Sequence, residues 1–287
     1  PPATRCSPPR PPPPPRRPLP LWGGPRAPAP VRGKREERSR KQLQRVLLGP
    51  QAAADETRLE GYLSAGHVDG VLMVSFHAED PFPERLRQRG MPVVMGGRPS
   101  GNAPMTYVDV DNVGGARLAV EHLVAIGRRR IATISGPLDM AAGIDRLQGF
   151  REAIKSAGLS ADASYERAGN FGQDSGAKAM QALLELHPDL DAVFCASDVM
   201  AAGALEVLRQ RGLEGPRDVA VVGFDDSSIA TSTVPNLSSV RQPIEEMGRE
   251  MARLLLSMID SAGLGGKRVI LATDLVVRAS SGQGGRE

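Results

Sequence analysis

Short apolar runs alternate with longer, partly polar segments along this chain from about residue 45 onward. Each run holds four to six residues with few polar interruptions, which is typical of a strand that is buried on both faces of a sheet. The runs predict strands at residues 46–49, 71–75, 93–96, 106–110, 131–135, 192–196 and 219–224.

The segments between these runs have the pattern of helices. Within residues 113–126, Leu118, Leu123 and Val124 fall near one stripe, and Gly127 follows as a stop signal. Strands and helices that alternate in this way form βαβ units, so we expect an α/β fold with parallel sheets. The other predicted helices are residues 144–157, 173–186, 199–211 and 244–259, and the last precedes a Gly-rich turn and an extended tail over 269–278.

The N-terminal region differs in composition from the rest of the chain. Residues 1–33 contain fourteen of the 25 prolines, and proline neither pairs well within a sheet nor continues a helix. We therefore expect residues 1–43 to form a disordered Pro/Arg-rich leader. A Pro-rich docking ligand and a frame-altered segment are the alternatives.

The formal net charge of +3 hides an uneven distribution. Residues 1–45 hold twelve Lys and Arg residues against two acidic residues, which leaves 24 basic against 31 acidic residues in the body. The body is therefore acidic, and an acidic surface does not have the electrostatic character of a nucleic-acid-binding domain.

Several classes of chemistry find no support in the sequence. The two cysteines, Cys6 and Cys195, do not suggest a disulfide framework, and no apolar run is long enough to cross a membrane. The signature motifs of serine hydrolases, P-loop proteins, zinc peptidases and dithiol redox proteins are missing, and the histidines are scattered. We therefore expect no enzyme activity, no cofactor, no metal site and no membrane association.

Polar residues follow several of the predicted strands directly, although the strands themselves are apolar. In open parallel sheets, ligands bind beyond the carboxyl ends of the strands, so residues at these positions are candidates for ligand binding. They include Ser75, Asp111, Ser197, Asp198, Asp225 and Asp226.

Two long segments resemble the LacI/GalR family of transcriptional regulators. They are VDVDNVGGARLAVEHLVAIGRRRIATISGP at 108–137 and FCASDVMAAGALEVLRQRGLEGPRDVAVVGFDDSSIATSTVPNLSSVRQP at 194–243, and the ending LVVRASS at 275–281 is also similar to the family's. The resemblance implies a two-lobed fold like that of periplasmic sugar-binding proteins. Each lobe has a parallel sheet flanked by helices, and the ligand cleft lies between the lobes.

The resemblance also implies how the chain is divided. Residues 44–111 and 242–281 are expected to form the N-terminal lobe, whose first strand and helix are not recognisable, and residues 112–241 to form the C-terminal lobe. Residues 282–287 are a tail. The chain is expected to cross between the lobes near Asp111–Asn112, near Arg241–Gln242 and again near the tail.

Three residues match effector-binding positions of the family. Asp225 matches an aspartate whose carboxylate can accept hydrogen bonds from neighbouring sugar hydroxyls. Arg146 matches an arginine near a helix start, with a planar donor fork, and Phe171 matches an aromatic residue that stacks on the effector ring. The structural alternatives are a helix cap or plain solvation for Asp225, a surface position for Arg146 and core packing for Phe171.

The remaining candidate residues have less specific roles. Ser197 and Asp198 match a polar pair at the start of a helix, where we expect Asp198 to be the N-cap and Ser197 to contact the ligand. We expect Asp226 to cap a helix. Ser75 and Asp111 are placed in the cleft by position alone.

By resemblance, the body is the effector-sensing core of a LacI/GalR-type repressor. We expect a cytoplasmic homodimer that binds a small molecule, a carbohydrate, between its lobes and thereby controls binding to operator DNA. Neither a helix-turn-helix nor a hinge helix is recognisable in the sequence, so no DNA-reading element is expected. Gly97, Met140 and Ala142 depart from the family's pattern and leave the identity of the effector open.

Two other functions share this fold class. A sugar-binding protein of an importer would require a secretory signal, and the N-terminal residues lack the apolar core of one. A sugar-modifying α/β enzyme would require a nucleophile or an acid/base pair, and no such set was found. The regulator is therefore the preferred interpretation.

Overall fold

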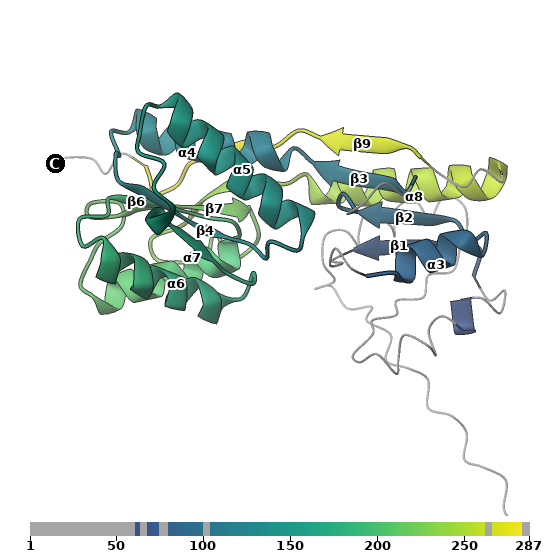
Figure 1. The fold of residues 1–287 in the computed structure, drawn as a ribbon, viewed down its shortest axis with the longest axis horizontal. Coiled ribbons are helices and arrows are strands. Elements are labelled where there is room, and N and C mark those ends of the chain that lie inside the picture. Colours follow the sequence, from purple (N-terminus) through teal and green to yellow (C-terminus); the bar gives the residue numbers. More distant parts are fainter. Residues whose placement is uncertain (1–60, 64–67, 75–79, 100–103, 262–265, 283–287) are drawn as a thin grey trace, which may run out of the picture.

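The computed structural model describes residues 61–63, 68–74, 80–99, 104–261 and 266–282. The predicted leader and the predicted strand at 46–49 lie outside these residues. The described chain forms two lobes that lie side by side, each with a sheet and flanking helices (Figure 1). The prediction of an α/β fold with parallel sheets is confirmed.

The first lobe contains a four-stranded parallel sheet in the order β1-β2-β3-β9. Three strands follow each other in sequence, and the fourth arrives from near the C-terminus and pairs with β3. The strands are β1 (Val71–Val74), β2 (Val93–Gly96), β3 (Thr106–Val110) and β9 (Arg268–Leu271).

Two helices cover the two faces of this sheet. Successive strand side chains point to opposite faces, so Val94 packs with Met251 of α8 (Ile244–Ser261), whereas Val93 and Met95 pack with Leu86 of α3 (Phe82–Gln88). The two faces therefore bury separate apolar clusters, and α8, which comes late in the sequence, packs in the first lobe.

The second lobe contains a six-stranded sheet in the order β10-β8-β7-β6-β4-β5, parallel except for β10. A 3-10 turn, η1 (Ala163–Tyr165), precedes β5. The strands are β4 (Ile131–Ser135), β5 (Glu166–Ala168), β6 (Ala192–Cys195), β7 (Ala220–Asp225), β8 (Ser238–Arg241) and β10 (Asp274–Val276).

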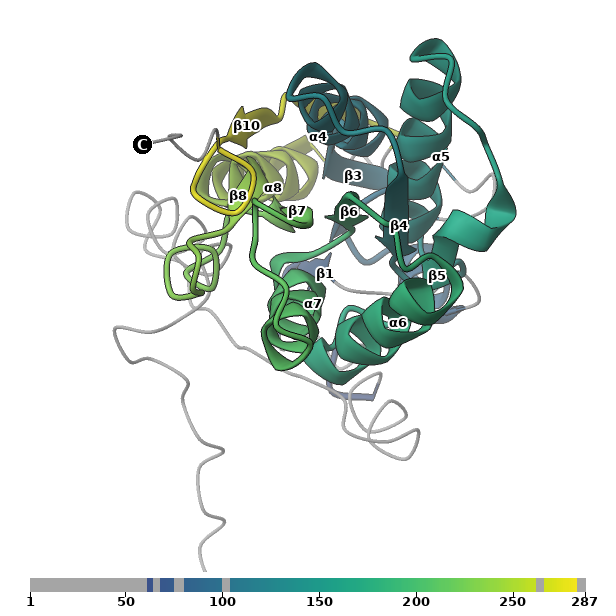
Figure 2. The ribbon, with the colours of Figure 1, turned by 90° about the vertical axis from the view of Figure 1, so that its left-hand side faces the viewer.

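Pairs of helices cover this larger sheet on both faces (Figure 2). On one face, α4 (Asn112–Ala125) and α5 (Ala141–Ser156) bury a cluster that includes Phe194 and Phe224. On the other face, α6 (Gln173–Leu186) and α7 (Asp198–Gln210) bury a cluster that includes Val193 and Val221. Both sides of the central strands are thus apolar, which explains why those strands were readable as continuous apolar runs.

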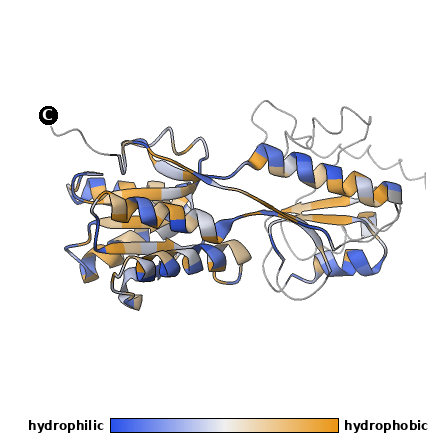
Figure 3. Ribbon diagram, turned by 90° about the horizontal axis from the view of Figure 1, so that it is seen from above, coloured by the Kyte–Doolittle hydropathy of each residue, from blue (hydrophilic) through white to orange (hydrophobic). Residues whose placement is uncertain are grey.

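The chain passes between the lobes three times (Figure 3). The crossings run from β3 to α4, from β8 to α8 and from β9 to β10. The first and third lie together, because the backbone N–H of Asp111 donates to the carbonyl of Leu271 over 2.9 Å. The first and third of the segments that join the lobes are therefore hydrogen-bonded to each other.

The expected assignment of residues 242–281 to the first lobe needs a correction. α8 and β9 do lie in that lobe, but β10 pairs with β8 in the second sheet. Beyond β10, Ser280 donates to the carbonyl of Val221 in β7. The C-terminal residues 274–282 therefore belong with the second lobe, since they complete an edge of its sheet.

Among the described residues, no helix combines the length and the apolar composition that a membrane span requires.

Candidate functional site

Asp225 ends strand β7 in a strained backbone conformation. Its φ is 114°, and Asp226 follows with a φ of 49°. Residues other than glycine rarely adopt positive φ, and such strain persists only where the surroundings hold the residue in place. The strain turns the chain abruptly at the carboxyl end of a buried strand.

Arg146 is the partner of Asp225 and lies inside the protein. It is only 5% exposed, and its Nη1 lies 3.3 Å from Oδ1 of Asp225. Its other polar contacts are the Oδ1 of Asn112, at 2.9 Å from Nε, and the carbonyl of Ala196, at 2.6 Å from Nη1. The guanidinium also lies over the ring of Phe224, 3.6 Å from its centroid. These contacts exclude the surface position that was the alternative for Arg146.

Burial and charge oppose each other at this pair. Burial lowers the pKa of the Arg146 guanidinium below its ordinary value, while the charge of Asp225 raises it. Burial likewise raises the pKa of Asp225, while Arg146 and Gln242 lower it. Each charge therefore offsets the desolvation of the other. The side chain of Asp225 keeps 29% exposure, which leaves part of it accessible to a ligand.

Gln242 completes the environment of Asp225 and was not among the predicted site residues. Its Nε2 donates to Oδ1 of Asp225 over 2.6 Å, and its carbonyl accepts from the N–H of Ile244 at the start of α8. Gln242 therefore links the site in the second lobe to a helix of the first.

Asn112 and Asp109 form a second group that the sequence did not assign to the site. Asn112 is 2% exposed, and its Nδ2 donates to Oδ1 of Asp109 over 3.1 Å. Burial raises the pKa of Asp109, against hydrogen bonds from the backbone N–H groups of Val110 and Arg98. Arg146 is thus oriented by a side chain that lies where the chain leaves β3 for the second lobe.

Phe171 lies beside Arg146, also in a strained conformation. Its φ is 65°, and its ring centroid is 5.9 Å from the Arg146 guanidinium carbon. The ring packs over Gly136, where an added Cβ would lie 2.3 Å from a ring atom. The ring is partly buried against the core formed with α6 and α7. The structure thus brings the three residues Asp225, Arg146 and Phe171 together.

The helix cap at the start of α7 is Ser197 and not Asp198. Ser197 is the N-cap, since its Oγ accepts from the N–H of Met200 over 3.2 Å. Asp198 is the first helical residue and is fully buried, and it accepts hydrogen bonds from Ser227 and Ser239. Burial raises the pKa of Asp198 to about 6. The prediction that Asp198 caps the helix is wrong, because Ser197 has the extended backbone of an N-cap residue.

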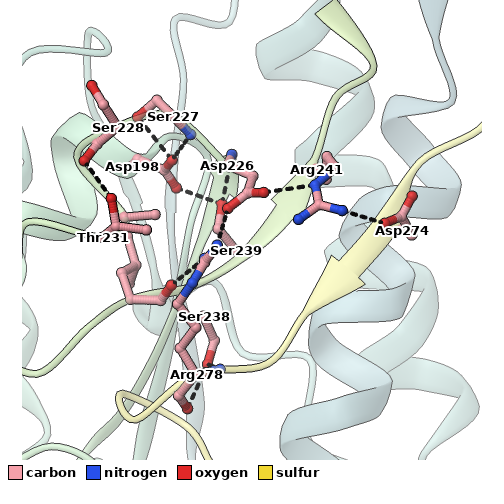
Figure 4. Close-up of polar contacts among 12 residues, drawn as sticks. Asp198, Asp226, Ser227, Ser228, Thr231, Ser238, Ser239, Arg241, Asp274 and Arg278 are labelled. Carbon is pink, nitrogen blue, oxygen red and sulfur yellow. Dashed lines mark hydrogen bonds and ion pairs between the residues drawn. The ribbon is translucent and has the colours of Figure 1, made fainter.

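Asp226 does not cap a helix, because turns rather than a helix follow it. Its carboxylate pairs with Arg241 at 2.7 Å and with Arg278 at 2.6 Å, as Figure 4 shows. Arg241 also reaches Asp274 of β10. Asp226 therefore joins the ends of β7, β8 and β10, next to the second and third crossings.

The two residues chosen by position alone have different outcomes. Asp111 is exposed and is the N-cap of α4, accepting from the N–H of Gly114 over 2.8 Å. Ser75 lies outside the described residues. Within the described part of the chain, no group of three or more His, Cys, Asp or Glu side chains could hold a metal ion.

Comparison with known proteins agrees with this architecture. Residues 120–281 match the family model of a periplasmic binding protein-like domain. The HTH-type transcriptional regulator CelR of Thermobifida fusca is 50% identical over 244 residues, which are 84% of this chain and 72% of CelR. The HTH-type transcriptional repressor CytR of Escherichia coli K12 is 35% identical over 75% of this chain and 63% of CytR.

Solved structures give the same result. The complex of the regulator CelR with cellobiose superposes with a TM-score of 0.84 at 48% identity, covering 88% of this chain and 78% of that one. A LacI-family regulatory protein from Chloroflexus aggregans superposes with a TM-score of 0.80 at 33% identity, covering 88% and 91%. These relatives are regulators and not enzymes or importer subunits. The chain therefore belongs to the LacI family of transcriptional regulators and carries that family's periplasmic binding protein-like, effector-binding fold.

Proposed function

We propose that this chain senses a carbohydrate at the group formed by Asp225, Arg146 and Phe171, and that it thereby controls the DNA binding of a repressor. The observation that carries the proposal is the Arg146–Asp225 pair, with an aromatic ring beside it, at the junction of the two lobes. The resemblance to a regulator solved with cellobiose supports a carbohydrate.

The chemistry of the three side chains suits a sugar. The partly exposed carboxylate of Asp225 accepts hydrogen bonds from hydroxyl groups, and the guanidinium of Arg146 donates in one plane. The face of Phe171 offers an apolar surface on which a sugar ring can stack. Ser197 and Asp198 adjoin this group, although both are buried, so we propose that they support it from behind.

Effector binding is expected to act through the crossings. Asp225 contacts Gln242 in the second crossing, and Arg146 contacts Asn112 at the first. A ligand that changes these contacts has different affinity for different lobe arrangements, and so shifts the population between them. We infer that the regulator acts as a cytoplasmic homodimer whose lobe arrangement determines affinity for operator DNA.

The experiment is a calorimetric titration of the chain with cellobiose, glucose, ribose and a nucleoside. The proposal expects saturable binding of at least one sugar with a stoichiometry near one. If none of the sugars binds to protein that shows a cooperative thermal unfolding transition, a carbohydrate effector is excluded. If only the nucleoside binds, the effector is a nucleoside and not a free sugar.

A further inference from the structure

Arg98 forms an ion pair between the two lobes. It lies just after β2 in the first lobe, and its Nη2 contacts Oδ1 of Asp145 in the second turn of α5 over 2.6 Å. Asp145 is 15% exposed and Arg98 is 42% exposed. The pair joins residues 47 positions apart in sequence, on elements that belong to different sheets.

The same two residues also belong to a closed ring of polar contacts. The backbone N–H of Arg98 donates to Oδ2 of Asp109 over 2.9 Å, and Oδ1 of Asp109 accepts from Asn112. Asn112 in turn accepts from Arg146, which directly follows Asp145 in α5. Five residues therefore connect the first lobe, the first crossing and the start of α5 in one circuit.

This circuit constrains Arg146 from two sides. Asn112 holds the guanidinium, and the Arg98–Asp145 pair holds the helix turn from which the Arg146 side chain projects. The buried members of the circuit, Asp109 and Asn112, are 6% and 2% exposed and have no freedom to reorient without losing hydrogen bonds. Opening of the lobes must break the Arg98–Asp145 contact, since it spans them.

We propose that Arg98 is an inter-lobe positioning residue. Its ion pair with Asp145 holds the second turn of α5 against the first lobe, biases the ligand-free protein toward the lobe arrangement seen here, and sets the orientation of Arg146. The effect on Arg146 as a binding residue rests on the proposed function, whereas the effect on lobe arrangement does not.

The size of the effect follows from the exposure of the pair. Partly exposed ion pairs contribute about 0.5–1 kcal/mol, which corresponds to a change of roughly two- to five-fold in a two-state ratio. Such a change is small against the free energy of unfolding of a domain. Loss of the pair should therefore alter lobe populations while leaving the protein folded.

The test measures the distance between the lobes without any sugar. Spin labels are attached to cysteines that replace Gln88 on α3 and Gln181 on α6, both of which are exposed, in a chain that also carries Cys6→Ser. The native Cys195 is buried.

The labelled parent is compared with four variants. They are Arg98→Gln, Asp145→Asn, the double variant, and the exchange Arg98→Asp with Asp145→Arg. Arg87→Gln is the matched control, because Arg87 pairs with Glu84 within one helix of the first lobe.

The proposal expects each single variant to change the ratio of the two lobe arrangements by roughly two- to five-fold. The double variant should add nothing to either single change, and the exchanged pair should restore the parental distances. Single variants that match the parent and the Arg87→Gln control, or a double variant whose effect is additive, would overturn it. Failure of cellobiose to bind the parent would count against the proposed effector alone, because this measurement needs no ligand.

Discussion

Gln242 donates a hydrogen bond to Asp225 over 2.6 Å, from the segment in which the chain returns to the first lobe. The contact joins the strained end of β7 to the start of α8. A ligand that binds the carboxylate of Asp225 therefore changes a hydrogen bond to the segment that connects the lobes.

Replacement of Gln242 by Leu should remove the hydrogen bond to Asp225 while a side chain of similar size still fills the position. We expect cellobiose affinity to fall by roughly three- to ten-fold, since Asp225 loses a neutral donor that orients it. Calorimetric titration measures the change. Gln210→Leu is the control, because the side chain of Gln210 donates to Glu206 on the exposed side of α7, away from Asp225. Equal affinities of the Gln242→Leu and Gln210→Leu proteins would contradict this role.

Asp225→Ala should affect both binding and stability. Sugar affinity is expected to fall by about 1.5–3 kcal/mol, the range for hydrogen bonds to charged groups. The free energy of unfolding should fall by about 1–3 kcal/mol, because Arg146 is left buried without its carboxylate. Urea denaturation and calorimetry measure the two quantities. Asp274→Ala, which removes a carboxylate that is 68% exposed, should change neither by more than about 0.5 kcal/mol.

Gly136→Ala should displace the ring of Phe171. The added Cβ would lie 2.3 Å from a ring atom, so the ring must move away from its place beside Arg146. We expect a loss of sugar affinity of about ten-fold, comparable to the value of one aromatic contact. Gly61→Ala is the control, since none of the described residues places an atom within 4 Å of the added Cβ there. An unchanged affinity would exclude ring stacking by Phe171.

Asp226→Ala is expected to destabilise the protein more than loss of a helix cap would. Arg278, which is 18% exposed, and Arg241, which is 49% exposed, both lose their carboxylate. We expect a loss of about 2 kcal/mol, mostly from the less exposed pair with Arg278. Urea denaturation tests this, with Arg241→Gln as the milder comparison. A loss below that of Arg241→Gln would show that the two pairs are not what stabilises this turn.

The buried carboxyl of Asp198 predicts a specific pH dependence. Its pKa in the folded protein is raised to about 6, so between pH 4 and 6 the folded state binds a proton that the unfolded state has released. The unfolding free energy contributed by this group therefore falls as pH rises through that range, by up to about 3 kcal/mol. Asp198→Asn should remove this contribution. Urea denaturation at pH 4.5 and 7.5 measures it, and an identical pH dependence in both proteins would contradict the raised pKa.

Much of the fold was predictable because its strands are buried on both faces. The predicted helix at 173–186 coincides with α6, and six predicted strands match β1, β2, β3, β4, β6 and β7 within two residues. β8 was missed because Ser238 and Ser239 are polar, although both are fully buried and are hydrogen-bonded by partners far along the chain. β5 has only three residues, two of them charged.

The site was predictable only in part. Asp225, Arg146 and Phe171 came from family resemblance, and the structure brings them together. Other contacts join residues that are far apart in sequence. Gln242, Asn112 and Arg98 are hydrogen-bonded to partners that are 17, 34 and 47 positions away. Periodicity and local spacing carry no information about such contacts, because they depend on how the two lobes meet.

The central claim is that a carbohydrate binds against Asp225, Arg146 and Phe171. A crystal structure of the protein grown with cellobiose tests it most directly. The account predicts electron density for the sugar with a hydroxyl within hydrogen-bonding distance of Asp225 and a ring face on Phe171. Density for the sugar bound elsewhere, with the Arg146–Asp225 pair free of ligand, would contradict it.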